Sequence, residues 1–203
     1  LKYKSNLKNF NELKNEYGGF YRYLLTETGV PKIDSLNITE ELQASYLIQQ
    51  SVLSDNYNIE ERYIYNFRNT SDENSDSEEF YGLLHNDYTP KPAYYAMKNY
   101  YENTNGAEYI GTINLADGLE AHVYDKDGKP KIITWSTNTN NTITIPYENF
   151  TASDMYGNAI ENTDRTLKIT SSPVYLDNVS TKYFYEAISN TALQKYAEFE
   201  EKF

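Results

Sequence analysis

Residues 20–29 read Phe-Tyr-Arg-Tyr-Leu-Leu-Thr-Glu-Thr-Gly, an aromatic and apolar run that ends in an acidic turn. Gly18 and Gly19 precede the run, and Glu27 follows its apolar part. A short run of β-forming residues bounded by turn residues is typical of a strand buried on both faces, as in a parallel sheet. The run therefore predicts a buried strand over 20–26, with Glu27 at its carboxyl end.

Helical and strand-like segments alternate around this strand. Apolar residues recur at three- and four-residue spacing over 6–17, and a helix over 39–53 opens with Thr followed by two Glu. β-forming residues fill 59–67, which predicts a second buried strand, and Pro92 opens a third helix over 93–101. This order indicates a parallel α/β architecture, which two strands alone cannot complete.

The pattern changes near residue 103 to short β runs separated by turns. Asp127-Gly128 between two of these runs favours a tight hairpin. Runs at this spacing predict an antiparallel β-sandwich, and 181–203 reads as a helical tail. We therefore expect α/β structure over 1–103, a sandwich over 104–180 and a helix over 181–203. The predicted sandwich strands are 109–114, 120–124, 131–135, 142–146, 165–169 and 173–176.

The amino-acid composition excludes several classes of partner and of catalytic chemistry. The chain has 203 residues and a formal net charge of −12, which repels a phosphate backbone and makes nucleic acid an unfavourable partner. Aromatic residues make up 15% of the chain, enough to build a core, and no apolar run is long enough to span a membrane. With no Cys and two His, thiol chemistry is excluded, and we expect neither a metal site nor a cofactor. Carboxylates must carry any catalysis.

Glu27 has two interpretations on local sequence. It is either a solvated turn glutamate before Gly29, or a functional carboxylate at the carboxyl end of a strand, where parallel sheets and barrels place their sites. Strand alternation would put Tyr23, Leu25 and Glu27 on one face. The spacing alone does not decide between the two interpretations.

Three segments together resemble the last quarter of a clan A glycoside hydrolase barrel. They are Leu-Leu-Thr-Glu-Thr-Gly over 24–29, Arg-Tyr-Ile-Tyr-Asn-Phe-Arg over 62–68, and Gly-Leu-Leu-His-Asn-Asp-Tyr-Thr-Pro-Lys-Pro-Ala-Tyr over 82–94. In that clan, Thr-Glu-x-Gly ends strand seven and presents the catalytic nucleophile. An aromatic residue at the end of strand eight forms the floor of the sugar site, and the third motif leads into helix eight. The resemblance covers residues 6–101.

The resemblance implies the carboxyl-terminal part of a (β/α)8 barrel, followed by a small antiparallel β-sandwich and a helix. It assigns Glu27 as the catalytic nucleophile of a retaining glycoside hydrolase and Tyr65 and Phe67 as substrate-binding residues. Tyr65 departs from the usual Trp of the family. The implied partner is a poly- or oligosaccharide, and the implied location is extracellular or at the cell surface.

The second catalytic carboxylate is missing from the expected context. In the clan it is a Glu that follows Asn at the end of strand four, but the Asn-Glu pairs here, Asn11-Glu12 and Asn15-Glu16, lie on the first predicted helix. Six barrel strands are missing as well. We therefore expect a fragment that is inactive alone, with the missing barrel portion or another chain as its partner.

Other interpretations remain open at this stage. Tyr65 and Phe67 would also suit packing of a barrel wall, and Arg62 and Arg68 suit either sugar contacts or surface salt bridges. The acidic loop over 72–79 resembles a calcium loop only in part and favours a solvated loop. Trp135 suits either core packing or sugar stacking. The competing function is a non-catalytic carbohydrate-binding or cell-surface structural module.

Overall fold

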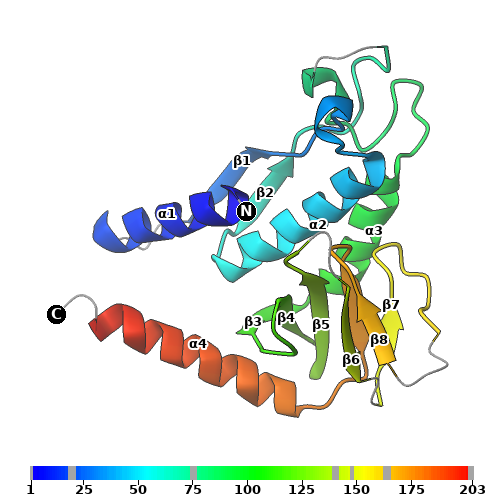
Figure 1. Ribbon diagram of the computed structural model, residues 1–203. Coiled ribbons are helices and arrows are strands. Elements are labelled where there is room, and N and C mark those ends of the chain that lie inside the picture. Colours follow the sequence, from blue (N-terminus) through cyan, green and yellow to red (C-terminus); the bar gives the residue numbers. More distant parts are fainter. Residues whose placement is uncertain are drawn as a thin grey trace. The chain divides into compact units, whose positions relative to one another are not determined.

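The computed structural model describes residues 2–17, 22–73, 77–138, 142–146, 149–161 and 166–200. The chain divides into two compact units, Leu1–Lys98 and Asn99–Phe203, and the division falls within a helix (Figure 1). The structure is mixed α/β, with a parallel strand pair in the first unit and antiparallel sheets in the second. Among the described helices, none is long and apolar enough to cross a membrane.

The first unit has the predicted order of helices and strands. Thr39 caps α2, since its hydroxyl accepts a hydrogen bond from the Leu42 backbone N–H at 3.3 Å. Pro92 is the first residue of α3, where its missing N–H leaves no helical bond unmade. The elements are α1 (Lys2–Tyr17), β1 (Leu24–Thr28), α2 (Glu40–Asn56), β2 (Glu61–Ile64) and α3 (Pro92–Thr104), with 3-10 turns η1 (Asp34–Leu36) and η2 (Ser77–Phe80).

Strands β1 and β2 are paired in parallel, which confirms the sequence prediction. Both are shorter than predicted, and residues 20 and 21 lie outside the described part of the chain. Pairing ends where Thr28 lies opposite Ile64, and the Tyr65 N–H then donates to the Thr28 carbonyl at 2.8 Å. After Tyr65 the chain no longer pairs with β1 and instead contacts the segment around Leu83. The Leu83 N–H donates a hydrogen bond to the Asn66 carbonyl at 3.2 Å.

The prediction that both strands are buried on two faces is wrong for the described structure. One face packs against helices: Tyr23 contacts Phe10 of α1 edge-to-face, and Arg62 forms an ion pair with Asp55 of α2 at 2.6 Å. The opposite face exposes large side chains, because the described residues of this unit place no second layer over it. The exposed side chains on the strands are Leu24 and Tyr63, and Tyr65 and Phe67 are exposed just after β2.

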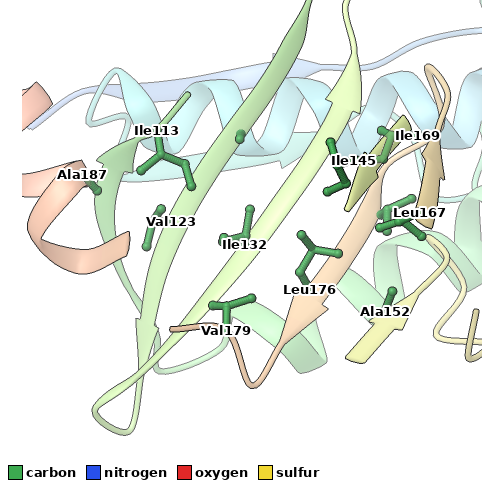
Figure 2. Close-up of a cluster of buried hydrophobic side chains, with 12 residues drawn as sticks. Ile113, Val123, Ile132, Ile145, Ala152, Leu167, Ile169, Leu176, Val179 and Ala187 are labelled. Atoms are coloured by element: carbon green, nitrogen blue, oxygen red, sulfur yellow. The ribbon is translucent and has the colours of Figure 1, made fainter. Parts of the chain in front are cut away.

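The second unit contains two antiparallel sheets around an apolar core (Figure 2). The strand order is β3-β4-β5-β9-β7 in one sheet and β6-β8 in the other. Asp127 and Gly128 have positive φ angles of 57° and 76° in the β4–β5 turn, as the hairpin prediction requires. The strands are β3 (Glu108–Thr112), β4 (Leu119–Lys126), β5 (Lys129–Ser136), β6 (Ile143–Pro146), β7 (Thr151–Ser153), β8 (Thr166–Ile169) and β9 (Val174–Asp177).

Helix α4 (Lys182–Glu200) packs on β3 within this unit, a partner that the sequence does not indicate. The Asn190 side chain donates to the Thr112 carbonyl at 2.9 Å, and Ala187 is buried in the core cluster. Trp135 is 2% exposed and stacks on His122 with ring centroids 5.0 Å apart. Trp135 is therefore a core residue, as its default interpretation predicts, and not an exposed stacking platform.

Candidate functional site

The candidate site lies at the carboxyl ends of β1 and β2, which point toward the group of loops drawn at the top of Figure 1. Glu27 is the penultimate residue of β1, and its side chain is exposed. The next residue, Thr28, accepts the backbone hydrogen bond from Tyr65 at 2.8 Å. The pairing thus brings the end of β1, which carries the predicted nucleophile, beside Tyr65, the predicted sugar-binding residue that directly follows β2.

Regular alternation would place Tyr23, Leu25 and Glu27 on one face, and the structure corrects this expectation. The β1–β2 register shifts between Leu25 and Thr28, so the alternation is interrupted just before the strand ends. Tyr23 packs against α1, and the Thr28 hydroxyl donates to the Gln50 side chain of α2 at 3.2 Å. Leu25 is half-buried while Glu27 is exposed. The Glu27 side chain is exposed, whereas the side chain of the next residue, Thr28, contacts α2.

Gly29 allows the chain to leave β1 close to β2. A Cβ at this position would lie 2.0 Å from the Tyr65 carbonyl oxygen and 2.8 Å from Cδ1 of Tyr81. No side chain larger than hydrogen fits there unless the backbone moves. Packing therefore explains why the Thr-Glu-x-Gly motif ends in Gly. The missing side chain of Gly29 lets the segments that carry Glu27 and Tyr65 approach each other closely.

The aromatic residues after β2 are exposed near this site. Tyr65 is 38% exposed and Phe67 is 62% exposed. Tyr65 is braced edge-to-face by Tyr81, with ring centroids 5.5 Å apart. Burial, together with the nearby Glu78 carboxylate, raises the pKa of the Tyr81 hydroxyl. Sequence reasoning missed Tyr81, although its position just before the Gly-Leu-Leu motif could have pointed to it.

A buried Asn holds the loop region behind these residues. Asn69 accepts a hydrogen bond from the Gly82 N–H at 2.9 Å and donates to Asp72 at 2.8 Å. The other Asp72 carboxylate oxygen accepts from the Asn86 N–H at 2.8 Å. The start of the acidic loop is therefore tied to the 82–91 hairpin, whereas residues 74–76 of that loop lie outside the described residues.

His85 lies between two carboxylates in the same region. Its Nδ1 is 3.6 Å from Asp72 and its Nε2 is 3.7 Å from Glu40. Asp72 is partly desolvated, but hydrogen bonds from Asn69 and Asn86 and the charge of His85 outweigh this and lower its pKa. Over the described ranges, no group of three or more His, Cys, Asp or Glu side chains could hold a metal ion. The contacts of His85 indicate a structural role.

Acid is expected to weaken this region through Asp72. Because folding lowers the pKa of Asp72, its contribution to stability is complete above the unfolded value near 3.8 and is lost as pH falls through the folded pKa. Asp72→Asn should therefore unfold at lower urea concentration than wild type at neutral pH, and the difference should close as pH falls through the lowered pKa of Asp72 in the folded state. The exposed Asp117→Asn variant is the control. A urea difference that is independent of pH would contradict this assignment.

The two arginines flanking β2 have different environments. Arg62 forms the ion pair with Asp55 on the helix side, so it is a structural residue. Arg68 donates from Nη1 to the Asn86 carbonyl at 2.7 Å and to the Asn86 side chain at 2.8 Å. Its guanidinium carbon lies 4.6 Å from the centre of the Tyr88 ring. Arg68 is therefore bound to the hairpin tip. The described contacts of Arg68 do not support the alternative that it forms a surface salt bridge.

No family model and no curated protein matches the sequence, but solved structures do match the fold. A family 39 glycoside hydrolase from the gut symbiont Bacteroides cellulosilyticus WH2 has a TM-score of 0.71 at 22% identity, over 84% of this chain and 37% of that chain. A family 30 endoxylanase from Clostridium papyrosolvens C71 has a TM-score of 0.52 at 13% identity, over 83% and 45%. A conserved exported protein from Bacteroides fragilis has a TM-score of 0.53 at 9% identity, over 86% and 42%.

These matches confirm, at the level of fold, the resemblance predicted from the sequence. The chain has a fold found in glycoside hydrolases of families 39 and 30. It spans less than half the length of each of these proteins. The similarity defines the fold of this chain but not its chemistry. The chemistry depends on the residues at the carboxyl ends of β1 and β2.

Proposed function

We propose that this chain supplies the carboxyl-terminal part of a retaining glycoside hydrolase that acts on a poly- or oligosaccharide, with Glu27 as the nucleophile. The observation that carries the proposal is the position of Glu27. It is an exposed carboxylate at the carboxyl end of a parallel strand, beside an exposed aromatic residue, in a fold also found in glycoside hydrolases. Carboxyl ends of parallel strands are where barrel enzymes place catalytic residues.

The exposed face of the strand pair supports a barrel origin. Leu24 is 45% exposed and Tyr63 is 55% exposed on the side away from α1 and α2. Parallel sheets are normally covered on both faces, and soluble proteins rarely leave large apolar patches open. We propose that β1 and β2 are the last two strands of a (β/α)8 barrel whose other strands bury this face. The second unit then corresponds to the β-sandwich that follows the barrel.

The chemistry requires a second carboxylate. In a retaining mechanism Glu27 attacks the anomeric carbon and forms a glycosyl ester, while an acid about 5 to 5.5 Å away protonates the leaving oxygen. That residue then removes a proton from the water that hydrolyses the ester. Glu12 and Glu16 lie on α1 and do not follow a strand, so neither suits this role. We propose that the acid comes from other barrel strands and that this chain alone is inactive.

Tyr65 and Phe67 are proposed to bind the substrate. An exposed aromatic ring offers a flat apolar surface to the C–H face of a sugar, while the hydroxyl groups of the sugar remain free for hydrogen bonds. A polysaccharide substrate favours action outside the cell or at its surface, and one protein of similar fold is an exported protein. We therefore propose an extracellular or cell-surface location.

The stereochemistry of the product tests this function. The complete protein that contains this chain would be incubated with soluble xylan, mixed-linkage glucan and galactan, and the anomeric proton of the first product would be followed by NMR. The proposal predicts retention of configuration, because two displacements restore it. Inversion would contradict Glu27 as a nucleophile. Binding of sugar without any hydrolysis would favour the non-catalytic carbohydrate-binding module instead.

A further inference from the structure

Tyr88 is an exposed aromatic residue in an unfavourable backbone conformation. It lies in the hairpin tip with φ of 70°, a left-handed region that Gly and Asn adopt at lower cost than Tyr. Its side chain is 66% exposed, so burial of the ring recovers little of that cost. Stability of the turn therefore does not explain a tyrosine here. A residue that is costly for folding and open to solvent is a candidate for function.

The Tyr88 ring is held in place. Arg68 lies over the ring with its guanidinium carbon 4.6 Å from the ring centre, and both Arg68 hydrogen bonds go to Asn86 in the same turn. Asn86 is fixed in turn by Asp72 through its backbone N–H. The Tyr88 N–H donates to the His85 carbonyl at 3.1 Å. The exposed ring is thus pre-oriented, which reduces the entropy lost when a ligand binds.

The position of Tyr88 relates it to the candidate site. The hairpin runs beside the segment that follows β2, since Arg68 and Leu84 form a parallel bridge and the Leu83 N–H donates to the Phe67 carbonyl at 3.1 Å. Arg68 is three residues beyond Tyr65, a span of at most about 11 Å. Tyr88 therefore lies on the hairpin that pairs with the segment after β2, at the end of the sheet that carries Glu27.

We propose that Tyr88 is a stacking platform for a sugar unit bound away from the cleaved bond, and that Arg68 is the residue that positions its ring. This inference rests on the proposed function and refines its substrate class. A ligand that has one unit at the cleaved bond and another on Tyr88 is an oligosaccharide or a longer chain. The Tyr88 ring face turned away from Arg68 packs against the C–H face of the distal sugar.

The test compares long and short ligands bound to the complete protein carrying Glu27→Gln, which prevents turnover. The probes are xylohexaose, cellohexaose and the 4-nitrophenyl glycosides of the same single sugars, measured by titration calorimetry. Tyr88→Asn should weaken hexasaccharide binding by about threefold to tenfold and leave the single-sugar glycosides unchanged. Tyr88→Phe keeps the ring and should bind like the parent.

Two controls separate binding from folding. Tyr88→Asn should keep the melting midpoint of the parent, because the lower cost of the left-handed conformation for Asn offsets the loss of the Arg68 contact. Tyr185→Asn removes an equally exposed tyrosine on α4 and should leave all affinities unchanged. Equal hexasaccharide affinity of Tyr88→Asn and the parent would overturn this inference while leaving the proposed function intact. Failure of the wild-type protein to bind any of the sugars would overturn both.

Discussion

Replacing Glu27 by Gln in the complete protein is expected to lower kcat on its polysaccharide by about three to six orders of magnitude, as removal of a covalent nucleophile does in other enzymes. The amide has nearly the same shape as the carboxylate, but it cannot form the glycosyl ester. Glu27 is exposed, so the substitution removes little packing and should leave the unfolding midpoint almost unchanged. Sugar binding should also persist, because the aromatic residues remain.

The matched control is Glu161→Gln, which removes the same charge from an exposed position in the second unit. This variant should keep wild-type kcat and stability. The decisive comparison is the initial rate of reducing-sugar release by the two variants at equal protein concentration. Wild-type activity in the Glu27→Gln variant would show that Glu27 is a solvated turn residue and not the nucleophile.

Gly29→Ala is expected to destabilise the first unit by about 3 kcal/mol or more, near or above the upper end of typical overpacking costs. The added methyl group would lie 2.0 Å from the Tyr65 carbonyl oxygen, which is backbone and cannot rotate away. The ends of β1 and β2 must separate to admit the methyl group. The substitution should therefore also lower kcat, since it displaces Glu27 relative to Tyr65.

Urea unfolding followed by circular dichroism measures this effect. Gly106→Ala is the control, because a Cβ there meets no atom within 4 Å and only its left-handed φ of 75° opposes the change. That variant should lose about 1 kcal/mol. If Gly29→Ala unfolded at the urea concentration of wild type, the close approach of the two strand ends would not be required by the fold.

Local signals made much of the fold predictable. Thr39 followed by two glutamates marked the start of α2, Pro92 marked the start of α3, and Asp127-Gly128 marked the β4–β5 hairpin. The parallel pairing of β1 and β2 followed from the alternation of helices and strands. The helix starts and the hairpin depend on residues close in sequence, and the parallel pairing follows from the order of the elements, so one sequence is enough to predict them.

Features that depend on distant contacts were missed. Strand β7 is only three residues of small or polar character, and pairing with β9, not a pattern of its own, places it in the sheet. The register shift before Thr28 arises between two strands and carries no local signature. The hydrogen bonds from Gly82 to Asn69 and from Asn69 to Asp72 join separate loops. Only three-dimensional pairing defines such contacts.

In the candidate site, too, the residues with a local sequence signal were predicted and those that depend on distant contacts were not. Glu27 was predicted because a motif carries it at a strand end, and Tyr65 because it matches the aromatic position that the glycoside hydrolase resemblance places at the end of the next strand. Tyr81 and Tyr88 were not predicted, since their contacts with Tyr65 and Arg68 depend on the folding of the hairpin back onto the segment after β2. The burial of the strand pair on one face only was also not predictable, because local sequence does not report which layers are present.

Covalent labelling distinguishes Glu27 from every other carboxylate of the protein as the nucleophile. The complete protein would be incubated with 2-deoxy-2-fluoro glycosyl fluorides, whose ring fluorine slows hydrolysis of the glycosyl ester while the good leaving group lets it form. Peptides would then be sequenced by mass spectrometry. We expect one fluoroglycosyl label, attached to Glu27 and absent from the Glu27→Gln variant. A label on any other carboxylate would contradict it.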